Sequence, residues 1–235
     1  MSSQTPRSLG ILNLERGLQP GAPPRKPKPG SMLNPATFDF PIISETVAGA
    51  WADVVIRGDP TLESACIAAA RRLVERGAVA ISANCGFFIR HQAAVAASVN
   101  VPVATSSLLL LPMLLRQLPR PAKIAVVAAD STCLVEDLLG VDDPTDRARV
   151  VIGGIEGGKL WRNEMMRPPL PTDVVDIEID VAACVARLRA AHPKIAAILF
   201  ECTAFPLVTP AIRNIIRLPI YDITTLCRLT FASIN

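Results

Sequence analysis

The sequence repeats itself at a spacing of 117 residues, with one cysteine in each copy. Cys85 ends an apolar run that begins at Gly77, and Cys202 ends a matching run that begins at Lys194. Seventeen residues after each cysteine, a proline opens a second short apolar run. The same offset matches Ala69 with Ala186, Arg72 with Arg189, Ala80 with Ala197, Phe88 with Phe205 and Leu109 with Leu226. This pattern predicts an internal duplication that keeps one thiol in each half.

The composition is typical of a globular protein with a full core. Of the 235 residues, 50% are hydrophobic and 19% charged, and the net charge is +3. Scattered basic residues and only 4% aromatic residues argue against a nucleic-acid partner, and the basic cluster Arg25–Lys28 is interpreted as a solvated loop. The longest apolar run, Leu108–Leu115, is too short to span a membrane, and the N-terminus has no apolar signal core. We therefore expect a cytoplasmic protein without a membrane partner, and leave assembly into a homo-oligomer open.

Short β-branched runs alternate with helical patterns along the chain. Strands are expected at 9–12, 79–82, 101–104, 124–128, 150–152, 195–200 and 219–221, and helices near 61–76, 89–99, 107–117, 131–139, 178–191, 206–217 and 223–233. Strands that are apolar throughout, separated by amphipathic helices, are typical of parallel sheets covered on both faces. We predict an α/β protein with two pseudo-symmetric, Rossmann-like subdomains and an active site in the cleft between them. Residues 1–105 plus 207–235 would form the first subdomain, and 106–206 the second.

Residues 15–41 are the exception, because they are rich in Pro, Gly and Lys. So long a stretch without a periodic pattern is usually a functional lid or a disordered segment. Its later part, Asn34–Pro41, has enough apolar residues to dock on the body of the protein. We favour a cover over the cleft.

The two repeated cysteines are expected to be chemical groups, because each lies where a strand gives way to a helix. Ligands bind beyond the carboxyl ends of parallel strands, and the positive end of the following helix lowers the pKa of a thiol. Two thiols facing one another across a cleft suit removal of a proton from carbon next to a carboxylate and its return on the opposite face. The other four cysteines, Cys66, Cys133, Cys184 and Cys227, fall in helical patterns and are interpreted as small, buried, reduced residues.

Small and polar residues flank the expected site. The candidates for substrate binding are Asn13, Gly86, Phe87, Ser106, Ser131, Thr132 and Thr203. Gly86 and Thr203 directly follow the two cysteines, so their backbone N–H groups can point toward an anionic substrate. For the serines and threonines, helix capping is the competing interpretation.

Other functions compete with proton transfer. A Cys/His hydrolase would need an oriented histidine, and neither His91 nor His192 is placed for that role. No group of His, Cys and carboxylate residues has metal-ligand spacing, and no lysine stands at a strand end as the cysteines do. We therefore expect neither a metal nor pyridoxal phosphate nor another cofactor. A non-catalytic small-acid-binding protein and a dithiol redox sensor are alternatives from other classes.

Around the two repeated cysteines, the chain resembles the aspartate/glutamate/hydantoin racemase superfamily. The resemblance runs from about Gly10 to the C-terminus. The matching pieces are Gly10–Asn13, Asn84–Phe87, Val101–Val103, Thr105–Ser107, Glu201–Thr203 and Leu218–Asp222. The resemblance implies a cofactor-independent racemase or isomerase acting on a small carboxylate or hydantoin-like substrate. It implies Cys85 and Cys202 as the acid/base pair, with Thr203 binding the substrate carboxylate. Arylmalonate decarboxylases of the superfamily keep one of the two cysteines, so an arylmalonate-type decarboxylase is the alternative, and two cysteines favour racemisation or isomerisation.

The chain departs from the amino-acid racemases beside both cysteines. Those enzymes usually follow the first cysteine with Asn-Thr, where this chain has Gly86 and Phe87. They often place His or Glu two residues after the second cysteine, where this chain has Ala204. Burying a charged amino group beside so few polar partners would be costly. We therefore expect a carboxylate or cyclic imide substrate with a partly apolar substituent.

Overall fold

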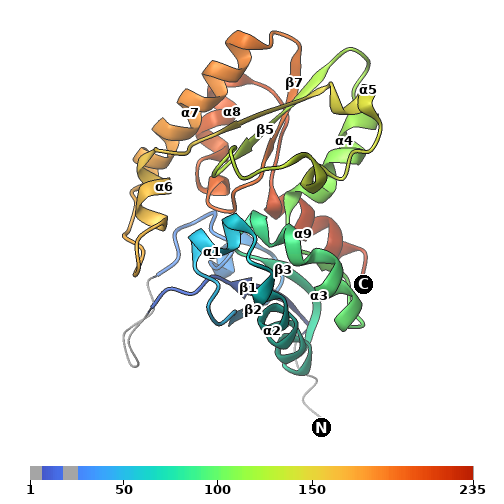
Figure 1. Cartoon of the computed structure of the whole chain (residues 1–235), viewed down its shortest axis with the longest axis vertical. Coiled ribbons are helices and arrows are strands. Elements are labelled where there is room, and N and C mark those ends of the chain that lie inside the picture. The colour runs from blue at the N-terminus through green and yellow to red at the C-terminus, as the bar shows by residue number, and fades with distance from the viewer. Residues whose placement is uncertain (1–6, 18–25, 235) are drawn as a thin grey trace. The chain divides into compact units, whose positions relative to one another are not determined.

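The computed structural model describes residues 7–17 and 26–234, which form two compact units (Figure 1). Unit 1 contains the chain up to Ser106 and again from Thr224, and unit 2 contains Ser107–Ile223. Each unit is built on its own four-stranded parallel sheet. The predicted α/β class with two Rossmann-like subdomains is thereby confirmed.

The elements of unit 1 are β1 (Ser8–Asn13), β2 (Ile42–Thr46), α1 (Ala52–Arg57), α2 (Glu63–Glu75), β3 (Ala78–Ala83), α3 (Gln92–Ser98), β4 (Val103–Ala104) and α9 (Ile223–Ala232). Those of unit 2 are α4 (Leu111–Gln117), β5 (Lys123–Ala128), α5 (Pro144–Arg147), β6 (Val150–Gly154), α6 (Lys159–Glu164), α7 (Val174–Ala191), β7 (Ile195–Phe200), α8 (Thr209–Ile216) and β8 (Ile220–Tyr221). The described helices are too short or too polar to cross a lipid bilayer.

The two sheets are built in the same way, as the sequence repeat predicts. Their strand orders are β2-β1-β3-β4 and β6-β5-β7-β8. The central pair of each sheet has a register shift at its first residues, between Ser8 and Leu9 in β1 and between Lys123 and Ile124 in β5. Even single hydrogen bonds recur, because Ile81 N–H donates to the carbonyl of Pro102 and Ile198 N–H to that of Pro219, both at 2.9 Å.

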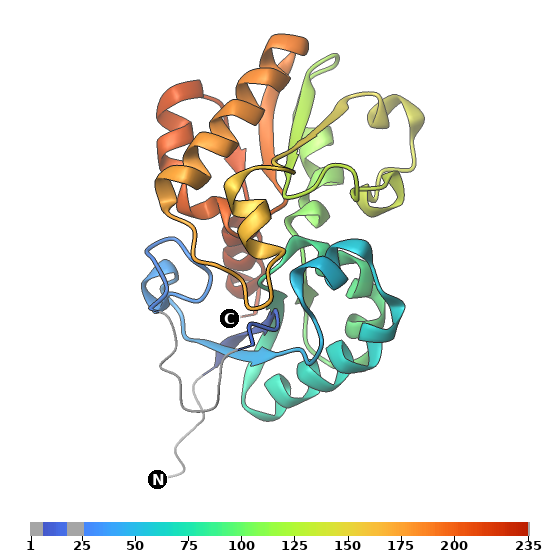
Figure 2. The same cartoon turned by 60° about the vertical axis from the view of Figure 1, so that its left-hand side comes forward.

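Apolar strands explain where the core of each unit lies. In unit 2 the strands β5 and β7 are buried almost throughout, and α7 covers them with a buried stripe at Ile177, Val181, Cys184, Val185 and Leu188. Figure 2 shows α7 and α8 on one side of this sheet, and in both views α4 lies on the other side. In unit 1, α2 packs on β1, β2 and β3 through Cys66, Ala69, Ala70 and Leu73. Sheets covered in this way read as continuous hydrophobic runs, which is why their strands are legible in the sequence.

The chain passes between the units twice, at equivalent positions. The first passage lies at Ser106/Ser107, one residue after the expected boundary between 105 and 106. The second lies at Ile223/Thr224, so the expected return after residue 207 is wrong. The reason is that α8 packs on α7, and β8 pairs in parallel with β7, which keeps both elements in unit 2. Only α9 returns, and its Cys227 Sγ lies 3.3 Å from Ser82 Oγ of β3.

The helix expected at 131–139 is not present in the structure. After β5 the chain forms a turn, and only Glu136–Leu139 become a short 3-10 helix. The carboxylate of Asp130 accepts hydrogen bonds from the backbone N–H and the hydroxyl of Thr132, which closes a local turn where a helix would have begun. Cys133 therefore lies half-buried in this turn, whereas Cys66, Cys184 and Cys227 are buried on helices as predicted.

The later part of the segment 15–41 docks on α9. Phe38 stacks on Phe40, and Phe40 stacks on Phe231 with ring centroids 4.0 Å apart. Arg228 donates to the carbonyl of Thr37 at 2.7 Å. The predicted docking is thus confirmed for residues of unit 1. Positions 18–25 lie outside the described residues, and the role of the segment as a cover is still a prediction.

We expect the aromatic stack to stabilise unit 1. Phe231→Ala should lower the free energy of unfolding by about 3 kcal/mol, because it removes a buried ring and leaves a cavity beside Phe40. Leu229→Ala on the same helix is the control, since Leu229 is 54% exposed and its truncation should change stability by less than about 0.5 kcal/mol. Both changes are measured by urea unfolding in a Trp161→Phe background, where the fluorescence of Trp51 reports on unit 1. Equal effects of the two substitutions would contradict the role of the stack.

Candidate functional site

Both repeated cysteines lie just beyond the carboxyl edge of the sheet in their own unit. Cys85 follows β3 with extended backbone, at φ −161° and ψ 127°, and a 3-10 helix begins at Gly86. Cys202 follows β7 and precedes the 3-10 helix Phe205–Leu207. The carbonyl of each cysteine accepts a hydrogen bond from the N–H three residues on, Phe88 at 3.2 Å and Phe205 at 3.1 Å. The two thiols therefore occupy equivalent turns.

A backbone ladder sets the position of each turn. Asn84 N–H, just before Cys85, donates to the carbonyl of Leu12 at 2.8 Å. Glu201 N–H, just before Cys202, donates to the carbonyl of Val127 at 2.9 Å. Because these bonds extend the pairing of the two central strands, each cysteine directly follows the last residue of this backbone ladder. Both thiols are half-buried, in contrast to three of the other four cysteines.

In unit 1, the predicted site residues gather at one edge because their strands are parallel neighbours. Asn13 is the last residue of β1, Gly86 follows β3, and Ser106 follows β4. The side-chain Oδ1 of Asn13 is buried and has no hydrogen-bond partner among the described residues. Phe87 is fully buried, with its ring 5.8 Å from the Arg90 guanidinium. Its predicted contact with substrate is untested, and its observed contact is with the protein interior.

In unit 2, the predicted residues Ser131, Thr132 and Thr203 also lie at the carboxyl edge, and the first two are held by carboxylates. Ser131 donates from its N–H and its hydroxyl to Glu156, while Thr132 donates to Asp130. Thr203, next to Cys202, is buried. The candidate residues of each unit therefore lie at the carboxyl edge of that unit's sheet, and their contact with a substrate is a prediction.

A glutamate that the sequence interpretation passed over stands out at this edge. Glu201 is 1% exposed, and its Oε2 accepts a hydrogen bond from the N–H of Ala129 at 3.1 Å. Burial raises the pKa of Glu201 to about 7, with the Ala129 hydrogen bond opposing the shift and the nearby Asp130 charge adding to it. Its Oε1 is buried without a partner among the described residues. The available signal in the sequence was an acidic residue that directly follows an entirely apolar strand.

The acid at Asp130 is the second group that the sequence interpretation underused. It is 6% exposed, and its Oδ2 accepts a hydrogen bond from the indole N–H of Trp161 at 3.0 Å. Two carboxyl groups thus lie beside the ends of β5 and β7. The charge of Asp130 adds to the effect of burial in raising the pKa of Glu201.

Histidine chemistry has little support in the structure. His91 is buried, burial lowers its pKa, and its Nε2 has no hydrogen-bond partner among the described residues. Burial also raises the pKa of Cys66 to about 12 and that of Cys184 to about 11, which makes both thiols poor nucleophiles. Among the described residues, no three His, Cys, Asp or Glu side chains gather to hold a metal ion.

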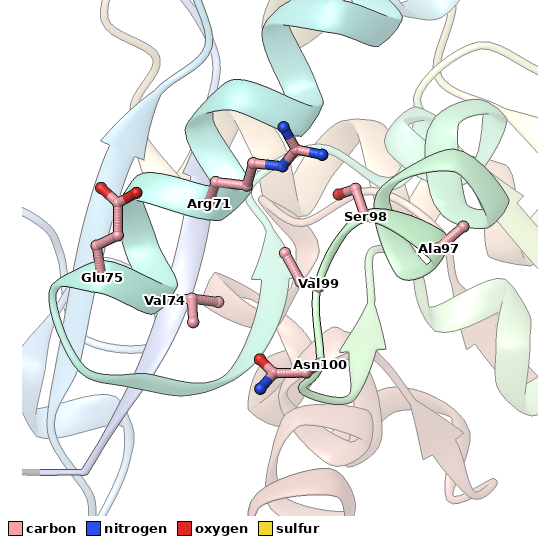
Figure 3. A pocket seen from close by; sticks show the side chains of 7 residues that line it. All are labelled: Arg71, Val74, Glu75, Ala97, Ser98, Val99 and Asn100. Atoms are coloured by element: carbon pink, nitrogen blue, oxygen red, sulfur yellow. The ribbon is translucent and has the colours of Figure 1, made fainter.

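A shallow surface pocket of about 410 Å³ lies at the other end of unit 1. Figure 3 shows Arg71 of α2 extending toward Ser98, in the turn from Ser98 to Asn100 that leads into β4; Val74 and Glu75 of α2 also line the pocket. This turn precedes β4, whereas the cysteine turn follows β3, so the pocket is at the amino edge of the parallel sheet. None of the predicted site residues lines it.

Ionisation of Glu201 should make unit 2 less stable as the pH rises. The native pKa is about 7 and the ordinary value is 4.5, so the native state binds more protons than the unfolded state between these values. The stability that the neutral form provides is present below pH 4.5 and is lost as the pH rises through about 7. Glu201→Gln stays neutral, so its stability relative to the natural protein should grow by about 3 kcal/mol between pH 4 and pH 8.

The measurement is urea unfolding in a Trp51→Phe background, where Trp161 reports on unit 2. Glu136→Gln is the control, because the Glu136 side chain is 67% exposed. Parallel stability curves for the natural protein and Glu201→Gln would contradict the raised pKa.

No family model matches the chain. Curated relatives do. A dimethylsulfoniopropionate lyase of Durusdinium sp. clade D is 30% identical over 92% of this chain and 71% of that protein. Dimethylsulfoniopropionate lyases 5 and 3 of Emiliania huxleyi are 25% and 28% identical, over 96% and 97% of this chain. The chain spans only 45% and 60% of the length of these two relatives.

Solved structures share the fold. Glutamate racemase of Bacillus anthracis has a TM-score of 0.58 and 14% identity, over 98% of this chain and 82% of that one. Glutamate racemase of Francisella tularensis, solved with D-glutamate, has a TM-score of 0.53 and 14% identity, over 98% and 83%. A variant of arylmalonate decarboxylase has a TM-score of 0.52 and 18% identity, over 91% and 87%.

At these identities the solved structures show a common fold and nothing finer. The sequence relatives decide the family, and they are named as lyases where the sequence analysis expected a racemase. The chain belongs to the dimethylsulfoniopropionate lyase family, and its fold is that of the aspartate/glutamate racemase superfamily.

Proposed function

We propose that this protein is a cofactor-independent lyase that uses a cysteine thiolate to remove a proton from carbon next to a carboxylate. The observation that carries the proposal is the 30% identity with the Durusdinium lyase over 92% of the chain. The equivalent turns of Cys85 and Cys202 support it, because each offers a half-buried thiol beyond the carboxyl edge of a parallel sheet. We take dimethylsulfoniopropionate, or a close analogue, as the substrate.

The chemistry of this substrate fits a thiolate base. Dimethylsulfoniopropionate has a carboxylate, a CH₂ group next to it, and a dimethylsulfonium group on the following carbon. A thiolate takes one proton from the CH₂ beside the carboxylate, and the C–H electrons form a carbon–carbon double bond. The C–S bond breaks with its electron pair going to sulfur. The products are acrylate, neutral dimethyl sulfide and a cysteine thiol, which then returns its proton to solvent.

This elimination shares its first step with racemisation, which is why the sequence pattern indicates the superfamily without deciding between the two reactions. In both, a base removes a proton next to a carboxylate. Racemisation then needs a second acid to return a proton on the other face. In the elimination the leaving group departs neutral and needs no proton, so one base is enough. We therefore propose unequal roles for Cys85 and Cys202, with one of them as the base.

Racemisation is the second candidate, and one observation favours it. The two cysteines have the same local backbone pattern in two structurally equivalent sheets, as a symmetric two-base reaction would require. The two candidates differ in what the single variants should do. A two-base enzyme loses two-way reaction when either thiol is removed, whereas a one-base lyase is asymmetric.

We expect the purified protein to release dimethyl sulfide from dimethylsulfoniopropionate. Cys85→Ala and Cys202→Ala should have unequal effects, and loss of the base should lower kcat/KM by at least ~100-fold. Cys133→Ala is the matched control, because Cys133 is the other half-buried thiol and belongs to neither repeat position. Headspace gas chromatography measures the product. Full activity in both single variants would exclude a thiolate base.

We also expect no interconversion of the enantiomers of glutamate or aspartate. The reason is that Gly86 and Ala204 leave few side-chain donors for a charged amino group beside the cysteines. Proton NMR in deuterium oxide detects exchange at the α-carbon of each compound. Exchange into one of these acids at a rate above that of dimethylsulfoniopropionate cleavage would favour the racemase instead.

A further inference from the structure

Glu201 joins the end of one strand to the end of its neighbour. Its backbone N–H extends the pairing of β7 with β5, and its side chain binds the N–H of Ala129, the residue after β5. The equivalent position in unit 1 is Asn84, whose backbone makes the same kind of hydrogen bond to Leu12. The duplication has therefore kept the backbone hydrogen bond at this position while the side chain differs. The side chain is an amide at Asn84 in unit 1 and a carboxyl group at Glu201 in unit 2.

Only one of the two carboxyl oxygens of Glu201 has a hydrogen-bond partner among the described residues. Oε2 accepts the Ala129 N–H, whereas the buried Oε1 has no partner among the described residues. Buried polar atoms without a partner are rare and call for an explanation. Because Oε2 acts as an acceptor, the proton of the neutral acid belongs on Oε1. Oε1–H is then a buried hydrogen-bond donor that lacks an acceptor within the described protein.

The charge of Asp130 favours the neutral form of Glu201, and the acids at this edge already have partners. Asp130 follows β5, and its two oxygens are bound by Thr132 and Trp161. Glu156 follows β6 and is bound by Ser131. Arg187 of α7 directs its guanidinium to the carbonyl of Gly154 at the end of β6, and Cys202 follows Glu201 in the same turn. The two other acids thus already have donors among the described residues.

We propose that Glu201, in its protonated form, binds the carboxylate of the substrate by donating a hydrogen bond from Oε1. The assignment rests on the proposed function, since it supposes an anionic substrate next to Cys202. A neutral acid gives the substrate a donor, whereas an ionised one would repel it. Placing this donor one residue before a cysteine turn would hold the carboxylate close to the thiol. Glu201 would then be a specificity residue for monocarboxylates in a site where the sequence suggested only backbone N–H groups and Thr203.

A pH dependence follows directly. Burial raises the pKa of Glu201 to about 7, so the donor is present below that value and is replaced by a repelling charge above it. Affinity for a carboxylate should therefore fall as the pH rises past 7. The thiolate works in the opposite direction, because a base becomes more available with rising pH. The pH dependence of binding can therefore be separated from that of turnover. Ionisation of Glu201 should change KM, whereas ionisation of the cysteines should change kcat.

The test measures binding of propionate, which has the carboxylate of the product without its thiol-reactive double bond. Isothermal titration calorimetry on the full chain from pH 6 to pH 8.5 should show the dissociation constant rising at least ~10-fold in the natural protein. Glu201→Gln keeps a permanent donor and carries no charge, so its dissociation constant should change by less than about twofold over the same range. Glu136→Gln, which removes an exposed carboxyl, should follow the natural protein. The KM for dimethylsulfoniopropionate should show the same three patterns.

The outcomes separate this inference from the proposed function. Cleavage of dimethylsulfoniopropionate with a KM that does not change with pH would overturn the role of Glu201 and leave the lyase intact. Propionate binding that depends on pH in the natural protein and not in Glu201→Gln, without any cleavage, would support the role of Glu201 and overturn the lyase. A purely structural role predicts that Glu201→Gln keeps the natural pH slope, and that slope, or failure of propionate to bind at all, would overturn the inference. A dissociation constant that stays constant from pH 6 to pH 8.5 in the natural protein would overturn the inference without any variant, so the inference can fail even if Glu201→Gln does not fold.

Discussion

The pairing of two central parallel strands in each unit is the interaction on which the other features depend. β1 with β3, and β5 with β7, carry their hydrogen bonds up to the residue before a cysteine, through Asn84 and Glu201. Because both strands of a pair run the same way, the residues that leave the sheet all emerge at one edge. The apolar strands fix this arrangement, since a shift of one residue would exchange the side chains that pack on one face of the sheet with those that pack on the other. The chemistry of the site is therefore a consequence of strand register.

The two copies of the repeat share this strand register but differ in the side chains around it. The shifts at Ser8/Leu9 and Lys123/Ile124 recur at the same point of the two sheets, which is expected if the backbone path is the selected property. The residue before each cysteine is an amide in one unit and an acid in the other. An elimination with a neutral leaving group needs a base on only one side of the substrate, whereas racemisation needs an acid/base group on both sides. The divergence at Asn84 and Glu201 is consistent with the unequal roles that we propose.

Much of the fold was predictable, for reasons visible in particular elements. β3 and β7 are buried on both faces and read as apolar runs, whereas β2 is an edge strand with polar residues at Ser44, Glu45 and Thr46, and it has no such signature. The turn after β5 was mistaken for a helix because Asp130 and Ser131 look like helix caps until their partners are known. The passage back to unit 1 was placed too early, although the 117-residue offset applied to Ser106/Ser107 gives Ile223/Thr224. Glu201 could not be singled out, because only tertiary packing shows that an acidic residue after a strand is buried.

The two passages between units have a historical consequence. Within the described residues, α9 completes unit 1 although it follows the last strand of unit 2, and α4 completes unit 2 although it follows the last strand of unit 1. A single copy of the repeat, standing alone, would lack the helix that the other copy now supplies. Such an ancestor is most simply a domain-swapped dimer, each copy lending its final helix to the other. Gene fusion would then have turned an exchange between two molecules into a connection within one, and freed the two halves to diverge.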